Sequence, residues 1–171
     1  MPGVISLVYD SLEASDLDWV LPDLRERGIC ATFFVDGESL TADITRWKHA
    51  VAEGNALGNG AALSVSMLKD RMSGSAIQEE VDDLQELIAQ LSSDPPHCFA
   101  ISDASGRLGG IETKRGEQLA VAQVKSADEL DRLNESKPIV ISLYRAHPQL
   151  HQHVLEWLSD RLDDIRLVAE I

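Results

Sequence analysis

The chain has 171 residues, of which 29 are acidic and 15 basic, so its net charge at neutral pH is −14. This excess of acid speaks against a nucleic-acid partner, because nucleic-acid binding depends on clustered Lys and Arg side chains. No stretch approaches the roughly 20 consecutive apolar residues of a membrane span, and no secretory leader pattern opens the chain. We therefore expect a single domain over residues 1–171 in the cytoplasm, with neither nucleic acid nor membrane as a partner. Cys30 and Cys98 are expected to be buried free thiols.

An apolar, β-branched run at residues 4–9 predicts the first strand. Asp10 and Ser11 follow this strand directly. Ligands of parallel sheets bind at the carboxyl ends of the strands, so Asp10 is a candidate functional group. The alternative is a structural role, in which the Asp10 carboxylate caps the helix beyond.

The run over residues 28–37 organises the rest of the fold. Its apolar and β-branched residues predict a central strand that is buried on both faces. Phe33 and Phe34 are neighbours in this strand, so we expect them to point to opposite faces of the sheet. Amphipathic helices are predicted before the strand, over residues 17–27, and after it, over residues 41–53.

The remaining chain alternates between predicted strands and predicted helices. Apolar residues at steps of four, three, four and three predict the clearest helix, over residues 73–91. Further strands are predicted over residues 56–60, 97–101, 118–124, 139–144 and 165–171, and further helices over residues 126–134 and 147–162. This alternation is typical of an α/β fold with a parallel sheet.

Two blocks of the chain resemble the polysaccharide deacetylase family. Residues 21–37 read L-P-D-L-R-E-R-G-I-C-A-T-F-F-V-D-G, which is close to the family block L-x-x-G-I-x-A-T-F-F-V-x-G. Residues 52–59 read A-E-G-N-A-L-G-N, which is close to A-x-x-G-H-E-I-G-N-H. The resemblance implies an irregular, partly open (β/α) barrel with its site at the carboxyl ends of the strands. It also implies a family activity, the metal-dependent removal of acetyl or related acyl groups from amides of sugars.

The matching positions do not retain the metal ligands of that family. The first family motif, T-F-D-D-G, supplies the catalytic base and one ligand, and the matching positions here are Asp10 and Ser11. The second motif, H-T-x-x-H, supplies two His ligands, and the matching positions are Gly60 and Ser64. Glycine has no side chain, and a serine hydroxyl is a poor ligand for zinc-like metals. These departures leave Asp10 as a candidate base and make Ser11, Gly60 and Ser64 degenerate ligand positions, so we expect neither a metal nor another cofactor.

The later family motifs are also incomplete in this chain. The Arg of the R-P-x-G-like segment is missing from the approximate match at residues 100–106. Leu143 stands near the position of the His that acts as general acid, and an apolar side chain cannot protonate a leaving amine. The residues that we expect to line a pocket around the degenerate site are Tyr9, Asn59, Asp103, Leu143 and Tyr144.

Three histidines lie near the start of the last predicted helix. His147 and His151 are four residues apart, a spacing that places two imidazoles on one helical face, and His153 lies beside them. These residues could share a metal. We favour the alternative, in which they are surface histidines, because no third ligand stands at a telling spacing.

Two functions are compatible with these residues. The first is a deacetylase-like domain that is non-catalytic and binds a carbohydrate, another small molecule or a protein partner, or serves assembly. The second is a hydrolase of non-peptide carbon–nitrogen bonds that works without a metal and uses Asp10 as its base. We favour the first, because metal, electrophilic stabilisation and general acid are missing together.

Overall fold

The computed structural model describes residues 3–10, 12–64, 74–92, 98–103, 107–113, 115–144 and 148–170. Its centre is an eight-stranded sheet with the order β6-β5-β4-β3-β2-β1-β8-β7. The strands are β1 (Ile5–Asp10), β2 (Thr32–Val35), β3 (Ala56–Asn59), β4 (Cys98–Ser102), β5 (Leu108–Thr113), β6 (Gln118–Ala120), β7 (Ala122–Gln123) and β8 (Ile139–Tyr144). The neighbouring strands in the run β4-β3-β2-β1-β8-β7 pair in parallel. Strand β5 pairs antiparallel with both β4 and β6. The predicted α/β fold is confirmed, but the sheet is mixed and not purely parallel.

The two edge strands of the sheet are consecutive in the chain, and this closes most of a barrel. Only Val121 separates β6, which pairs with β5, from β7, which pairs with β8. The Gln123 side chain donates a hydrogen bond to the Leu108 carbonyl of β5 over 2.6 Å. The sheet therefore curls into the nearly closed barrel that the family resemblance implies.

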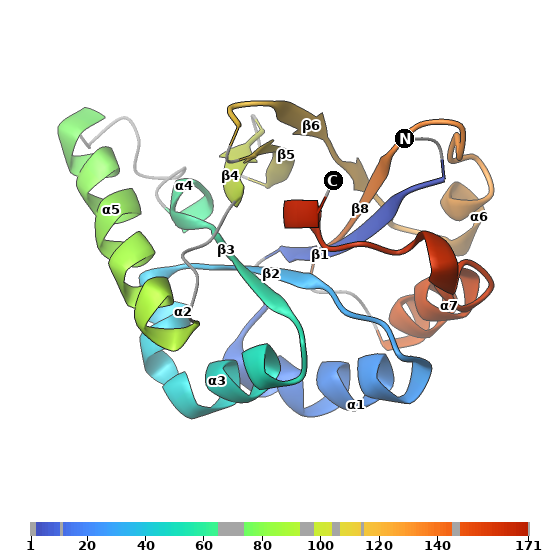
Figure 1. Cartoon of the computed structure of the whole chain (residues 1–171), viewed down its shortest axis with the longest axis horizontal. Helices are drawn as coiled ribbons and strands as arrows, with labels where there is room; N and C mark the ends of the chain where they lie inside the picture. Colours follow the sequence, from blue (N-terminus) through green and yellow to red (C-terminus); the bar gives the residue numbers. More distant parts are fainter. Residues whose placement is uncertain are drawn as a thin grey trace.

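Helices cover the outer side of this barrel. They are α1 (Leu17–Arg27), α2 (Gly37–Ala42), α3 (Ile44–Ala52), α4 (Ala61–Ser64), α5 (Gly74–Leu91), α6 (Ala127–Leu130) and α7 (Pro148–Ser159). Short 3-10 turns lie at η1 (Ala14–Asp16), η2 (Leu162–Asp164) and η3 (Val168–Glu170). Figure 1 shows α1 and α3 beneath β1 and β2, with α5 and α7 on opposite sides of the molecule. None of the helices in the described part of the chain is long and apolar enough to cross a membrane.

The strands separate two apolar cores, and β2 contributes to both. Phe33 belongs to the outer core between the sheet and the helices, where it stacks on Tyr9 with ring centroids 5.0 Å apart. Phe34 belongs to the inner core of the barrel, together with Val8, Cys98 and other buried side chains. All four residues of β2 are buried. The predicted central strand, with its two Phe side chains on opposite faces, is confirmed.

Two predicted elements differ where polar side chains stop a helix. The helix predicted over residues 41–53 is two helices, because Asp43 leaves helical geometry and its carboxylate caps α3 by accepting the Arg46 N–H over 3.2 Å. The helix predicted over residues 126–134 is shorter, since α6 ends at Leu130 and turns follow it.

The strand predicted over residues 165–171 is wrong. Only Ile165 bridges to Ile5, and the chain then forms the η3 turn, which places Val168 in the inner core. The physical reason is that β8 pairs with β1 along its whole length and β2 pairs with it from Val8 to Asp10. Only the start of β1, at Ile5, is left open, and it accommodates a single bridge and not a strand.

Both cysteines are free, as predicted, but they differ in burial. Cys98 is buried in the inner core, and burial raises the pKa of its thiol to about 12. Cys30 is only half-buried, so the expectation of a buried thiol is wrong for this residue.

Candidate functional site

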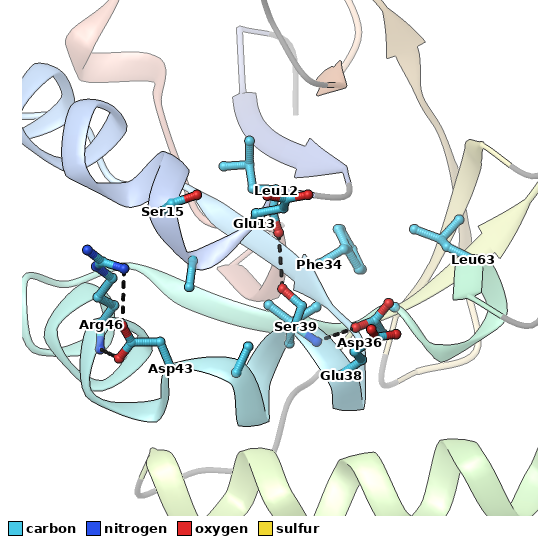
Figure 2. Close-up of a pocket in the computed structure, with 14 residues that line it drawn as sticks. Leu12, Glu13, Ser15, Phe34, Asp36, Glu38, Ser39, Asp43, Arg46 and Leu63 are labelled. Carbon is cyan, nitrogen blue, oxygen red and sulfur yellow. Dashed lines mark hydrogen bonds and ion pairs between the residues drawn. The ribbon is translucent and has the colours of Figure 1, made fainter.

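A pocket of about 560 Å³ opens at the carboxyl ends of β1, β2 and β3 (Figure 2). Three loops form it, each following one of these strands, together with the end of α2 and the start of α3. Its lining residues are Leu12, Glu13, Ala14, Ser15, Phe34, Val35, Asp36, Glu38, Ser39, Ala42, Asp43, Arg46, Gly60 and Leu63. The pocket therefore lies at the edge of the sheet where the sequence predicted a site.

Hydrogen bonds join the loops after β1 and β2 in one wall of the pocket. The Asp36 carboxylate caps α2 by accepting the Ser39 N–H over 2.7 Å. The Ser39 hydroxyl in turn donates to the Leu12 carbonyl over 3.1 Å, which ties the loop after β2 to the loop after β1. Figure 2 shows both bonds. The protein's own hydrogen bonds therefore fix the shape of this part of the pocket wall.

The opposite wall carries an ion pair. The Arg46 guanidinium lies 3.1 Å from the Asp43 carboxylate and 2.9 Å from the Asp18 carboxylate. Two carboxylates thus already balance the positive charge of Arg46. Among the described lining residues, four carboxylates stand against this one guanidinium, so the pocket is electronegative.

Asp10 lies at the end of β1, inside the barrel, and is not among the residues that line the pocket. Only 1% of it is exposed, and one of its carboxylate oxygens accepts the Leu108 N–H over 2.9 Å. The Arg107 Nε atom lies 3.8 Å from the same oxygen. Asp10 therefore joins the end of β1 to the start of β5 across the barrel.

Arg107 was not predicted as a site residue from the sequence, although the R-P-x-G-like segment of the family contains an Arg. Arg107 stands one residue beyond the approximate match at 100–106. It lies directly before β5, which pairs antiparallel with β4, and its N–H donates to the Asp103 carboxylate over 3.0 Å. The one signal in the sequence was the position of Arg107 directly after the residues that match this segment.

Gly60, where the family resemblance places a His ligand, has no room for a side chain. Its N–H donates to the Val35 carbonyl over 2.8 Å, and a Cβ atom added to Gly60 would meet that same oxygen at 2.8 Å. The close approach of the β2 backbone therefore requires glycine here. Ser11 and the side chain of Ser64 lie outside the described residues.

The described residues do not fit the divalent metal that the family resemblance would imply. The Asp10 carboxylate is occupied by a backbone N–H, and Gly60 offers no ligand atom. In the part of the chain that the structure describes, no group of three or more His, Cys, Asp or Glu side chains could hold a metal ion.

Four of the five residues expected to line a pocket are described, and none of them lines this one. Tyr9 and Leu143 face the outer core beneath the helices. Asn59 also points outward, where its amide donates to the Val81 carbonyl and the Gln85 side chain, each over 3.0 Å. Asp103 forms the turn before β5. The side chain of Tyr144 lies outside the described residues.

The histidines near α7 have different environments. His147 lies outside the described residues, and His153 is exposed. His151 is fully buried, with its Nε2 atom 2.5 Å from the Tyr9 hydroxyl and its Nδ1 atom 3.3 Å from the Asp23 carboxylate. The expectation of surface histidines is therefore wrong for His151.

Comparison with solved structures shows the fold of CE4 family polysaccharide deacetylases. The peptidoglycan deacetylase PdaC from Bacillus subtilis superposes with a TM-score of 0.65 at 19% identity, covering 99% of this chain and 89% of that chain. A family 4 carbohydrate esterase from Bacillus anthracis gives a TM-score of 0.67 at 14% identity, with 99% and 82% covered. BA3943, a CE4 family pseudoenzyme from Bacillus anthracis, gives 0.69 at 12% identity, with 99% and 65% covered. No family sequence model matches the chain, and no curated protein sequence matches it either.

Proposed function

We propose that this chain, built on the fold of the CE4 polysaccharide deacetylases, is a non-catalytic domain that binds a carbohydrate in the pocket at the ends of β1, β2 and β3. The observation that supports this most is the position of Gly60, where the family resemblance places a His ligand. The β2 backbone occupies the space that any side chain there would need. We further propose that residues 1–171 act as one domain, and that it works in the cytoplasm, where Cys30 and Cys98 stay reduced.

The chemistry of the pocket suits a ligand with many hydroxyl groups. Carboxylates such as Asp36 and Glu38 accept hydrogen bonds from hydroxyl donors, and charge makes such bonds stronger than neutral ones. Leu63, which is half-buried, contributes apolar surface against which the C–H face of a sugar ring can pack. A solved structure of similar fold, the Bc1960 peptidoglycan N-acetylglucosamine deacetylase, is a complex with a small organic molecule. An oligosaccharide of N-acetylglucosamine is therefore the first ligand to test.

The test is a calorimetric titration of the protein with such an oligosaccharide. Glu38 is exposed on the first turn of α2 and lines the pocket, so Glu38→Gln removes a charged acceptor with little effect on folding. We expect this variant to weaken binding about tenfold, the magnitude of one hydrogen bond to a charged group. Glu156→Gln is the matched control, because Glu156 is exposed on α7 and does not line the pocket. Equal binding by both variants, or no binding by the wild type, would contradict the proposal.

One observation favours the second candidate, a hydrolase of carbon–nitrogen bonds that uses Asp10 as its base. Asp10 and Arg107 lie together at the carboxyl end of β1, with the Arg107 Nε atom 3.8 Å from the buried Asp10 carboxylate. In that case Asp10 would take a proton from an attacking water, and the positive charge of Arg107 would favour the negative charge that develops. Loss of turnover in Asp10→Asn would distinguish this candidate from the first.

A further inference from the structure

Three elements meet at the buried imidazole of His151. The ring extends from α7 and lies between Tyr9 of β1 and Asp23 of α1. Trp19, also on α1, packs its edge against the ring with centroids 4.9 Å apart and planes at 85°. The imidazole is 0% exposed, so its polar atoms depend on protein partners. This cluster of Tyr9, Asp23 and His151 lies on the outer side of the barrel and does not belong to the pocket.

The partners of the ring determine where its proton lies. A carboxylate only accepts hydrogen bonds, so the proton of the neutral ring belongs on Nδ1, which faces Asp23. Nε2 is then an acceptor, and it receives the Tyr9 O–H over 2.5 Å. Phe33 stacks on the other side of the Tyr9 ring and fixes its position. The neutral form of His151 therefore matches the Tyr9 hydroxyl, and its Nδ1 atom faces the Asp23 carboxylate at 3.3 Å without meeting hydrogen-bond geometry.

A second proton would break this match. It would bind to Nε2 and convert the acceptor of the Tyr9 hydroxyl into a donor. The Tyr9 O–H would then need another acceptor in a site that excludes water, and an unsatisfied buried hydroxyl is costly. The ring would also become a buried cation. Protonation therefore disfavours the packed position of α7 on β1 and α1.

The charges around the ring act in both directions. Burial lowers the pKa of His151, the Asp23 carboxylate opposes this shift, and the Arg27 guanidinium adds to it; the net direction is downward. Burial, and then the negative charge of Asp23, raise the pKa of Tyr9 well above its usual value, so Tyr9 keeps its proton. On α6, which also packs on α7, Asp128 is exposed and the Glu129 carboxylate accepts the Lys125 N–H over 2.8 Å. Strand β8 contains no charged residue.

We propose that His151 is an acid-sensitive latch that holds α7 against β1 and α1 while its ring is neutral, and that releases α7 when the ring gains a proton. The latch is made by the short contact with Tyr9 and by the Asp23 carboxylate at the other ring nitrogen. Release exposes the buried face of α7, which carries Val154, Leu155 and Leu158. This inference is independent of the ligand and of the chemistry at the pocket.

The direction of the pH effect follows from linkage. Because the folded-state pKa of His151 is lowered below the ordinary value near 6.5, the unfolded chain binds more protons between these two values. The contribution of the neutral His151 ring to the free energy of unfolding is complete above about pH 6.5, and it is lost as the pH falls towards the folded-state pKa. At pH 5.0 the unfolding equilibrium constant rises by at most about 30-fold from this one group.

Urea unfolding at pH 7.5 and pH 5.0 tests the latch. His151→Gln keeps an acceptor for Tyr9 and a donor for Asp23 but does not titrate. We expect the unfolding constant of the wild type to rise several-fold more on acidification than that of His151→Gln. His153→Gln, an exposed change on the same helix, is the matched control and should behave as the wild type does. The same pH dependence in the wild type and His151→Gln would overturn the proposal.

Two measurements on the wild type keep the proposal testable if His151→Gln does not fold. In an NMR titration, the His151 ring should gain its proton below the ordinary value near pH 6.5; protonation above that value would overturn the latch. In hydrogen exchange, corrected for intrinsic rates, amides of α7 should lose more protection than amides of β2 between pH 7.5 and pH 5.0. Equal loss in both elements would mean that acid does not act through α7, and would also overturn it.

Discussion

Gly60 has the backbone of β2 directly against the place where a side chain would begin. A Cβ atom in ideal geometry on Gly60 would lie 2.8 Å from the Val35 oxygen, which is too short for any real side chain. The same carbonyl accepts the Gly60 N–H, so the two segments cannot part without losing a hydrogen bond. A His at this position would need a different path of the backbone.

We predict that Gly60→Ala destabilises the protein by about 1–3 kcal/mol, because the added methyl group must displace backbone. Gly37→Ala is the matched control. Gly37 begins α2 and has nothing within 4 Å of its Cβ position, so alanine there should be neutral or slightly stabilising. Urea unfolding of both variants measures the difference. Equal stabilities would show that the approach of β2 is not as close as described.

Strand β2 is the element that connects the two cores. Phe33 packs against Tyr9 and against the Trp47 ring, whose centroid lies 6.0 Å away. Both the Phe33 and the Trp47 side chains are 0% exposed. The outer core between the sheet and the helices therefore depends on one aromatic ring from the middle of the sheet.

Truncation of Phe33 to Ala should cost about 3–5 kcal/mol, because it removes buried apolar surface and leaves a cavity. The comparison is Phe99→Ala in β4, where the ring is only half-buried and the loss should be smaller. Chemical denaturation measures both losses of unfolding free energy. The dependence of that free energy on denaturant concentration should have the same slope in the variants and the wild type. A loss below about 1 kcal/mol for Phe33→Ala would contradict the assignment of β2 to the centre of the core.

Elements with a strong local pattern could be predicted from the sequence, whereas those that depend on distant partners could not. Helix α1 has a regular apolar face and ends at Gly28, which adopts a positive φ of 67°. In contrast, β5 contains Gly109 and Gly110 and was not predicted. It forms because β4 and β6 pair with it and because Asp10 holds its first residue. No pattern within residues 108–113 reports these contacts.

The candidate site could be located from the sequence, but its residues could not be identified. The carboxyl ends of β1 and β3 were expected, and Gly60 lines the pocket there. Asp36, Asp43 and Arg46 were not singled out, because nothing local shows that this segment faces the loops after β1 and β3 across a pocket. Likewise, the burial of His151 depends on α1 and β1, which are far from it in the chain.

For the whole molecule, the fold of the CE4 deacetylases is combined with described residues that include no group of three or more His, Cys, Asp or Glu side chains able to hold a metal ion. The barrel and its covering helices agree with the CE4 structures, and the pocket opens at the carboxyl ends of the strands. One of the similar structures is itself a pseudoenzyme. The functional proposal is thus that the fold keeps a carbohydrate pocket without the chemistry.

The most direct test of this central claim is the release of acetate from an N-acetylglucosamine oligosaccharide. The wild type and Asp10→Asn are incubated with the substrate, with and without added Zn²⁺, and acetate is quantified against a buffer blank. We predict that both proteins release no more acetate than the blank under either condition. Acetate release by the wild type that Asp10→Asn abolishes would contradict the claim and establish Asp10 as a catalytic base.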